Sequence, residues 1–361
     1  MNPNLTVFAL SLPITLAFFG CDGDSTAGSA GSTSSQGGGG STSSTAGGGT
    51  STTGGSGGST GGTGGTNTGG STGGSTTSSG GTGGSPLDCQ NLPIGPLTPQ
   101  LVTAVFNGSE DIAFDGKGHI AGKQGAAVIL VDSAGQTTQL ANNVPDAYGL
   151  RYLPNGLLIA ALPSNGKLVE ISPAGAVADY AGGLATPNGV YPDFDGNVWV
   201  TEFGGNKVTR INPDKTETPI ISGAEASSAN GIVLDKTRNL LFYTNYGQGR
   251  IRKVDLGAAN FTGVEVIQIP NAKLDGLVMD ACGHLYVVDQ GGSDLYRVQL
   301  DPAGNAMGTE ELLASFPKNV ANAQFGSGSG FDNQTLYVAG VPGSVYSINV
   351  GVPGAPVPTV P

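Results

Sequence analysis

Ser228-Ala-Asn-Gly-Ile-Val-Leu-Asp and its near-copy Lys273-Leu-Asp-Gly-Leu-Val-Met-Asp contain the same phrase. An Asn or Asp precedes a glycine, and a short apolar run then ends in Asp. Four further copies lie at residues 108–115, 147–152, 186–193 and 321–325, the first with Asp in place of the glycine. The residues at the shared position are Glu110, Tyr148, Asn188, Asn230, Asp275 and Asn322, at intervals of 38, 40, 42, 45 and 47 residues. Such intervals are typical of one four-stranded blade, so the sequence contains six repeats.

Within each repeat, short strand-like segments alternate with turn residues. In the third repeat, Val198-Trp-Val-Thr and the alternating Lys207-Val-Thr-Arg-Ile are separated by Phe203-Gly-Gly-Asn. No long stretch of the chain has helical periodicity. We therefore predict an all-β fold, a six-bladed β-propeller, rather than a sandwich.

The last repeat lacks an outer strand, because its tail is rich in proline, which cannot donate ladder hydrogen bonds. The segment at about 101–107, Leu101-Val-Thr-Ala-Val-Phe-Asn, immediately precedes the first inner strand, where an outer strand belongs. We expect it to complete the sixth blade and close the ring, which would remove an open sheet edge.

Composition divides the chain into three parts. Residues 22–86 consist almost wholly of Gly, Ser and Thr after two initial Asp residues, a composition that favours a disordered linker. Residues 87–361 are long enough for one large propeller domain. The net charge is −12 with no cluster of Lys or Arg, which argues against nucleic acid or an anionic lipid surface as a partner.

The N-terminus resembles a bacterial lipoprotein signal. An apolar run at residues 5–20 is too short to span a bilayer, and Phe19-Gly-Cys ends it. In lipoproteins the Cys of such a lipobox is lipidated, which here would make residues 1–21 the signal segment and Cys21 the anchor. An ordinary secretory signal with an incidental Cys is the alternative. Either reading predicts export, and the first places the protein in the cell envelope, with membrane contact only through the lipid.

Two cysteines remain in the domain, Cys89 and Cys282. In an exported protein such a pair favours a disulfide bond. The predicted topology places both cysteines on the face opposite the starts of the inner strands. Two unpaired thiols are the alternative.

Among the residues at the shared position of the repeats, Glu110, Asn188, Asn230 and Asp275 are oxygen donors. Because all six inner strands begin at one face of the ring, these side chains should converge at the channel mouth. Two carboxylates and two amides suit a hard cation such as Ca²⁺, and zinc is disfavoured because no His joins them. The alternative is that Asn-Gly and Asp-Gly are only turn formers.

The phrases Ser109-Glu-Asp, Pro187-Asn-Gly, Ser228-Ala-Asn-Gly and Leu274-Asp-Gly-Leu resemble the regucalcin/gluconolactonase superfamily of six-bladed propellers, over about residues 100–350. The resemblance implies one divalent metal held by Glu110, Asn230 and Asp275. It also implies that Asn188 helps to hold water or substrate, and that Asp275 is a base for water in lactone or ester hydrolysis.

Two further residues are expected near the mouth. Glu202 ends a second strand and is a candidate auxiliary catalytic or substrate-contacting residue, its alternative being a solvated loop carboxylate. Tyr148 is a candidate substrate contact that could also obstruct the mouth. A segment around Trp199 looks like a repeat of streptogramin lyases. Those enzymes need a catalytic His, and His119 and His284 are expected on the far face.

Three functions therefore remain open. The leading prediction is a metal-dependent hydrolase of a lactone or ester. The second is a non-catalytic module that binds a small ligand or an extracytoplasmic protein, with a structural metal. The third is a structural propeller without metal. We expect a monomer in each case.

Overall fold

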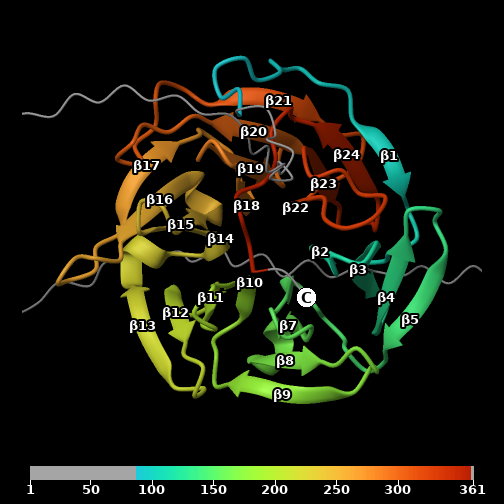
Figure 1. Ribbon diagram of the computed structural model, residues 1–361. Helices are drawn as coiled ribbons and strands as arrows, with labels where there is room; N and C mark the ends of the chain where they lie inside the picture. The colour runs from blue at the N-terminus through green and yellow to red at the C-terminus, as the bar shows by residue number, and fades with distance from the viewer. Residues whose placement is uncertain (1–86, 359–361) are drawn as a thin grey trace, which may run out of the picture. The chain divides into compact units, whose positions relative to one another are not determined.

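The computed structural model describes residues 87–358, and its structured unit is a β-propeller of six antiparallel four-stranded sheets (Figure 1). The predicted fold is confirmed. The signal segment with Cys21 and the linker at 22–86 lie outside the described residues. The only helical elements in the described part are three short 3-10 turns: η1 (Pro163–Asn165), η2 (Gly223–Ala226) and η3 (Tyr246–Gln248).

Each blade uses its strands in the same order from the channel outward. The innermost strands are β2 (Ile112–Phe114), β6 (Leu150–Tyr152), β10 (Pro187–Pro192), β14 (Ala229–Asp235), β18 (Leu274–Met279) and β22 (Asn322–Phe325). The second strands are β3 (His119–Gln124), β7 (Leu158–Leu162), β11 (Val198–Glu202), β15 (Leu240–Asn245), β19 (Leu285–Asp289) and β23 (Thr335–Ala339). Most second-strand side chains are buried, because neighbouring blades cover both faces of each sheet.

The outer half of each blade is more exposed. The third strands are β4 (Ala127–Asp132), β8 (Lys167–Ile171), β12 (Lys207–Ile211), β16 (Arg250–Asp255), β20 (Asp294–Val298) and β24 (Val345–Asn349). The outer strands are β5 (Thr137–Ala141), β9 (Val177–Gly182), β13 (Glu217–Ser222), β17 (Val264–Gln268), β21 (Glu311–Ser315) and β1 (Gln100–Thr103). Third strands such as β12 combine buried and partly exposed positions, as expected of strands nearer the solvent.

An N-terminal strand closes the ring. β1 pairs antiparallel with β24, so the sixth sheet has the order β1-β24-β23-β22. The strand spans four residues and is shorter than the 101–107 segment expected from the sequence. Inner strands β2 and β22 are also in contact, which completes the circle of inner strands. The six sheets therefore form one closed ring, in which the N-terminal strand β1 is the outer strand of the last blade.

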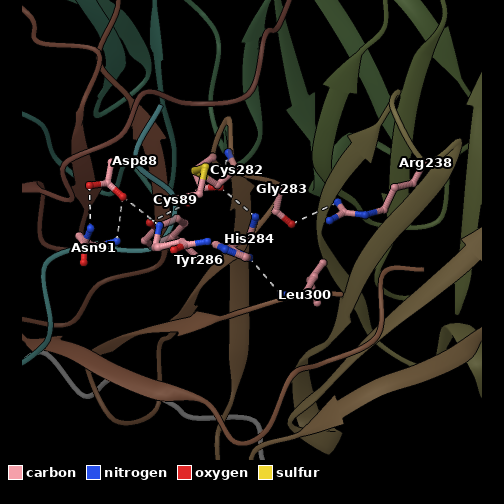
Figure 2. The surroundings of a disulfide bond; sticks show 11 residues. Asp88, Cys89, Asn91, Arg238, Cys282, Gly283, His284, Tyr286 and Leu300 are labelled. Atoms are coloured by element: carbon pink, nitrogen blue, oxygen red, sulfur yellow. Dashed lines mark hydrogen bonds between the residues drawn. A yellow bond between two sulfur atoms is a disulfide. The ribbon is translucent and has the colours of Figure 1, made fainter. Parts of the chain in front are cut away.

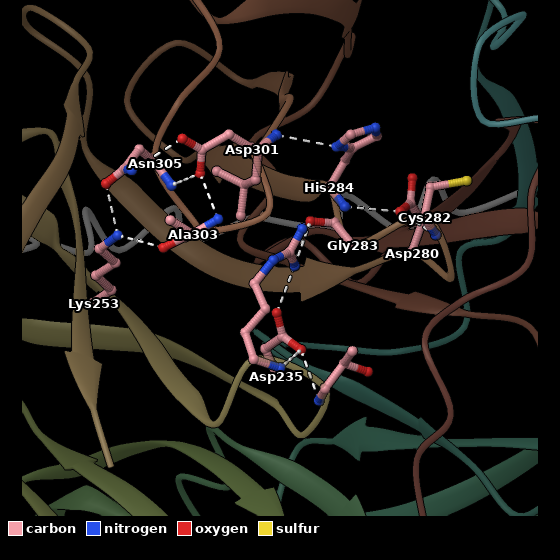
Figure 3. A network of polar contacts seen from close by, with 12 residues as sticks. Asp235, Lys253, Asp280, Cys282, Gly283, His284, Asp301, Ala303 and Asn305 are labelled. Carbon is pink, nitrogen blue, oxygen red and sulfur yellow. Dashed lines mark hydrogen bonds and ion pairs between the residues drawn. The ribbon is translucent and has the colours of Figure 1, made fainter. Parts of the chain in front are cut away.

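The final Asp of the repeated phrase forms the turn after the inner strand. Asp193 accepts the backbone N–H groups of Asp195 and Asn197, both at 2.9 Å. Asp280 does the same for Cys282 and His284, again at 2.9 Å (Figure 3). A carboxylate that binds the turn's own amides in this way fixes the hairpin on the far face of the ring.

Cys89 and Cys282 are joined by a disulfide bond with an S–S distance of 2.00 Å (Figure 2). The bond links the segment before β1 to the turn between β18 and β19. The two cysteines are 193 residues apart in the sequence. Close by, Arg297 donates to Glu311 at 2.6 Å and to the Pro93 carbonyl at 3.0 Å. The N-terminal segment is therefore fastened to the fifth blade by the disulfide bond and by the hydrogen bond from Arg297 to Pro93.

Candidate functional site

The glycine of the repeated phrase lets neighbouring inner strands approach closely. A methyl group at Gly149, Gly189 or Gly231 would lie 2.1–2.2 Å from the carbonyl oxygen of Asn188, Asn230 or Asp275, respectively. Each of these oxygens belongs to the shared position of the next blade. None of the three glycines has a positive φ. The need for close packing, and not turn formation, therefore explains why glycine stands at these positions.

Two threonines on second strands reinforce this contact. The Thr201 hydroxyl accepts the N–H of Gly189 at 2.8 Å and donates to the Asn230 carbonyl at 2.5 Å. Thr244 repeats the arrangement for Gly231 and the Asp275 carbonyl, at 2.7 and 2.9 Å. The backbone of Asn230 and Asp275 is therefore held by the preceding blade, which places both residues at equivalent positions around the channel.

Glu110 and Asp275 form a pair of like charges at the channel mouth, the face where the inner strands begin. Asp275 is only 3% exposed, and burial, followed by the charges of Glu110 and Asp111, raises its carboxyl pKa well above the ordinary value. Burial is also the largest cause of the rise in the Glu110 pKa to about 7, which Lys123 opposes and Asp111 increases. The Asn230 side chain hydrogen-bonds the Asp275 carboxyl and acts in the opposite direction.

The other buried carboxylates in the described part of the chain have clear partners. Asp111 forms an ion pair with Arg151 and accepts the Leu150 N–H at 3.0 Å. Asp235 pairs with Arg238 at 2.5 Å. Asp275, by contrast, has no bonded cation and no backbone N–H among the described residues. A buried carboxylate left in this state is costly unless a cation or a proton neutralises it.

Glu202 has a different environment from the pair at the mouth. Its carboxylate is fully buried, accepts the Ala185 N–H at 2.8 Å and the Thr209 hydroxyl at 2.5 Å, and pairs with Lys207 at 2.9 Å. Asp289 ends β19, the second strand of the fifth blade, and its carboxylate similarly accepts the N–H of Lys273 at 2.8 Å. These contacts fix the loops that lead into the inner strands, and they leave Glu202 engaged rather than solvated.

Tyr148 and Tyr246 lie within electrostatic reach of the two carboxylates. Burial raises the pKa of both phenols, with Glu110 and Asp275 adding to the rise, and the Tyr246 value reaches about 12. Tyr148 is partly buried and Asn188 is partly buried at the start of β10. Both phenols therefore remain protonated at neutral pH, and each can donate one hydrogen bond.

Sequence reasoning missed Tyr246 and Asp111 as neighbours of the site, and Arg151 as the partner of Asp111. Tyr246 directly follows Asn245, the end of β15, and its hydroxyl donates to Gln290 at 2.6 Å. For Tyr246, the sequence signal was its position directly after a second strand. For Asp111, it was the position next to Glu110 in the repeated phrase.

The donor set fits a hard divalent cation. Glu110, Asn230 and Asp275 provide two carboxylates and one amide, all oxygen ligands, and Ca²⁺ takes six to eight oxygens that can include water or substrate. Among residues 87–358, no group of three or more His, Cys, Asp and Glu side chains is arranged to hold a metal ion.

No protein-family model matches the chain, and no curated protein matches it by sequence. Solved structures match its fold. A candidate gluconolactonase studied by X-ray crystallography has a TM-score of 0.60 at 20% identity, covering 73% of this chain and 96% of that one. Regucalcin from Agrobacterium tumefaciens, described as a calcium-binding protein, has a TM-score of 0.59 at 16% identity, covering 74% and 99%.

A third similar structure is a gluconolactonase from Xanthomonas campestris, with a TM-score of 0.58 at 17% identity, covering 74% of this chain and 96% of that one. These matches show that the chain has a fold similar to that of the gluconolactonase and regucalcin structures. At identities of 20% or less they establish the fold.

Proposed function

We propose that this protein is a divalent-cation-dependent hydrolase of a lactone or ester. The observation that carries the proposal is the buried pair Glu110 and Asp275, brought together from two blades beside Asn230 without a bonded protein cation among the described residues. Groups whose pKa is raised by burial and a like charge are typical of functional sites. The similarity of the fold to gluconolactonase structures supports the reaction class.

In this proposal Glu110, Asn230 and Asp275 hold the cation, with Ca²⁺ as the expected ion. A bound cation would polarise the carbonyl of the substrate. Asp275 accepts the proton of the attacking water, whose oxygen forms the new bond to the carbonyl carbon. The ring or ester C–O bond then breaks, and its oxygen receives the proton, which gives a hydroxy acid or an acid and an alcohol. Asn188 and Tyr148 contact the substrate.

The contacts of Glu202 favour a positioning role over direct catalysis. Its carboxylate binds Ala185 and Lys207, so it holds the loop that precedes Asn188. Glu202→Gln should weaken the contacts that hold this loop and therefore raise KM. If Glu202 were a catalytic base, the same replacement would mainly lower kcat.

A lactone panel tests the proposal. The full-length protein is incubated with sugar lactones and simple esters, and acid release is followed with Ca²⁺ and with EDTA. We expect Ca²⁺-dependent hydrolysis that Asp275→Asn reduces at least 100-fold and that Asp179→Asn, the same change at an exposed outer-strand position, leaves intact. Ca²⁺ binding without hydrolysis of any substrate would instead favour a ligand- or protein-binding module.

We also propose that the protein is exported and lipid-anchored through Cys21. The sequence of residues 5–21 supports this, and it lies outside the described residues. Within the described part, no helix combines the length and hydropathy needed to cross a membrane. The Cys21→Ser variant should move from the membrane fraction to the soluble fraction, and its retention in the membrane would contradict the anchor.

A further inference from the structure

A cavity lies at the far end of the channel, where the inner strands end. Its volume is about 420 Å³, within the range of small-molecule sites. Each inner strand contributes to its wall: Phe114, Tyr152, Tyr191, Val233, Val278 and Phe325. We call this space the far-end cavity. The repeated phrase places Asp275 and the metal candidates at the opposite end of the same strands, so the far-end cavity is distinct from the channel mouth.

The C-terminal segment forms the outer wall of the far-end cavity. Residues 353–358 line it, and the chain runs into the middle of the ring in Figure 1. Backbone hydrogen bonds fasten this segment at Pro353, which accepts from Ala281 at 2.8 Å, and at Ala355, which donates to Met279 at 2.9 Å. Beyond Ala355, two of the next three residues are prolines without an N–H, so this wall is apolar.

The charges in the wall are balanced. Arg151 is the one ionic side chain that lines the far-end cavity, and its guanidinium is bonded to Asp111 and to the Leu150 carbonyl at 2.6 Å. No carboxylate lines the cavity among the described residues. An anion would therefore compete with Asp111 for Arg151, and a cation would find no partner. The cavity is suited to an uncharged ligand.

One hydrogen-bond donor in the wall is unused. The Gln324 side-chain nitrogen is buried and has no acceptor among the described residues. A buried donor without a partner carries a free-energy penalty, which an acceptor on a ligand would relieve. The aromatic rings of Phe114, Tyr152 and Phe325 would cover the apolar part of the same ligand.

We propose that the far-end cavity binds an uncharged small molecule with an aromatic body and a carbonyl oxygen, and that this oxygen accepts a hydrogen bond from Gln324. The proposal does not depend on the hydrolase function, because it uses no residue of the channel mouth. It adds a second ligand site to the propeller, covered by the C-terminal segment.

Prodan, an uncharged naphthalene ketone whose emission shifts to the blue in apolar surroundings, is the probe. It is titrated into the full-length protein, alongside an analogue in which a methylene replaces the ketone. We expect saturable one-site binding, with the ketone preferred about 5- to 10-fold over the analogue, as one neutral hydrogen bond would give. Gln324→Leu should abolish the preference. Gln334→Leu, the same change at an exposed position, should retain it.

A second variant locates the binding. Ala355→Trp places a large side chain on the covering segment, outside the sheets, and should weaken Prodan binding at least 10-fold while the thermal midpoint stays within a few degrees of the wild type. The proposal would be overturned by the absence of saturable binding. Binding that Gln324→Leu and Ala355→Trp both leave unchanged would overturn it equally, because the probe would then occupy another site.

Discussion

The raised pKa of Glu110 predicts how the stability of the metal-free protein changes with pH. Its folded-state value of about 7 lies above the ordinary value of 4.5, chiefly because of burial. The folded state therefore favours the protonated carboxyl. The stabilisation relative to an unperturbed carboxyl is fully present below pH 4.5 and is lost as the pH rises through about 7. At 1.36 kcal/mol per pKa unit, the loss is about 3 kcal/mol.

Glu110→Gln isolates this effect. Because Gln does not ionise, the difference in free energy of unfolding between the variant and the wild type should grow by about 2.5 kcal/mol between pH 5 and pH 8 in EDTA, since part of the loss already occurs below pH 5. Urea unfolding followed by fluorescence of Trp199, the single tryptophan and a buried one, measures it. Glu217→Gln, at an exposed strand position, is the control and should follow the wild type.

Added Ca²⁺ provides a second check. The cation should neutralise the pair and flatten the wild-type profile at high pH, and it should have little effect on the Gln variant. A wild-type profile parallel to that of Glu110→Gln across this pH range would refute the reasoning, because Glu110 would then not be buried beside a like charge.

Two other perturbations have outcomes set by the fold. Reduction or Ser replacement of Cys89 and Cys282 should lower the free energy of unfolding by about 5 kcal/mol on the chain-entropy model, because the bond closes a loop of 193 residues; urea unfolding with and without the bond measures this. Gly231→Ala should destabilise the protein by about 1–3 kcal/mol and weaken Ca²⁺ binding, because the methyl group would lie 2.2 Å from the Asp275 carbonyl oxygen. Gly247→Ala, which meets no atom within 4 Å, is the matched control, and equal thermal midpoints for the two variants would contradict the packing argument.

The fold was predictable because each residue of the repeated phrase has a local physical task. The glycine admits the next strand, the apolar run forms the buried inner strand, and the final Asp closes the turn, as at Gly189 and Asp193. These tasks repeat in several blades and leave a visible period. The same regularity puts Glu110, Asn230 and Asp275 at equivalent positions of three blades, and their role as metal ligands stays a prediction.

The chemistry of individual side chains was less predictable. Glu202 looked like a free carboxylate because its partners Lys207 and Ala185 are not marked by the repeat. The role of Arg151 depends on Asp111, which lies 40 residues earlier. The far-end cavity combines six strands with the C-terminal segment, so no local pattern encodes it. Such features depend on three-dimensional contacts between residues distant in sequence.

Calorimetric titration of the full-length protein with Ca²⁺, alongside Asp275→Asn, tests the central claim most directly. The account predicts binding at a single site, weaker at low pH because the carboxyls must lose protons, and abolished in the variant. Binding of no divalent ion, or binding that Asp275→Asn leaves unchanged, would contradict a cation site at the channel mouth.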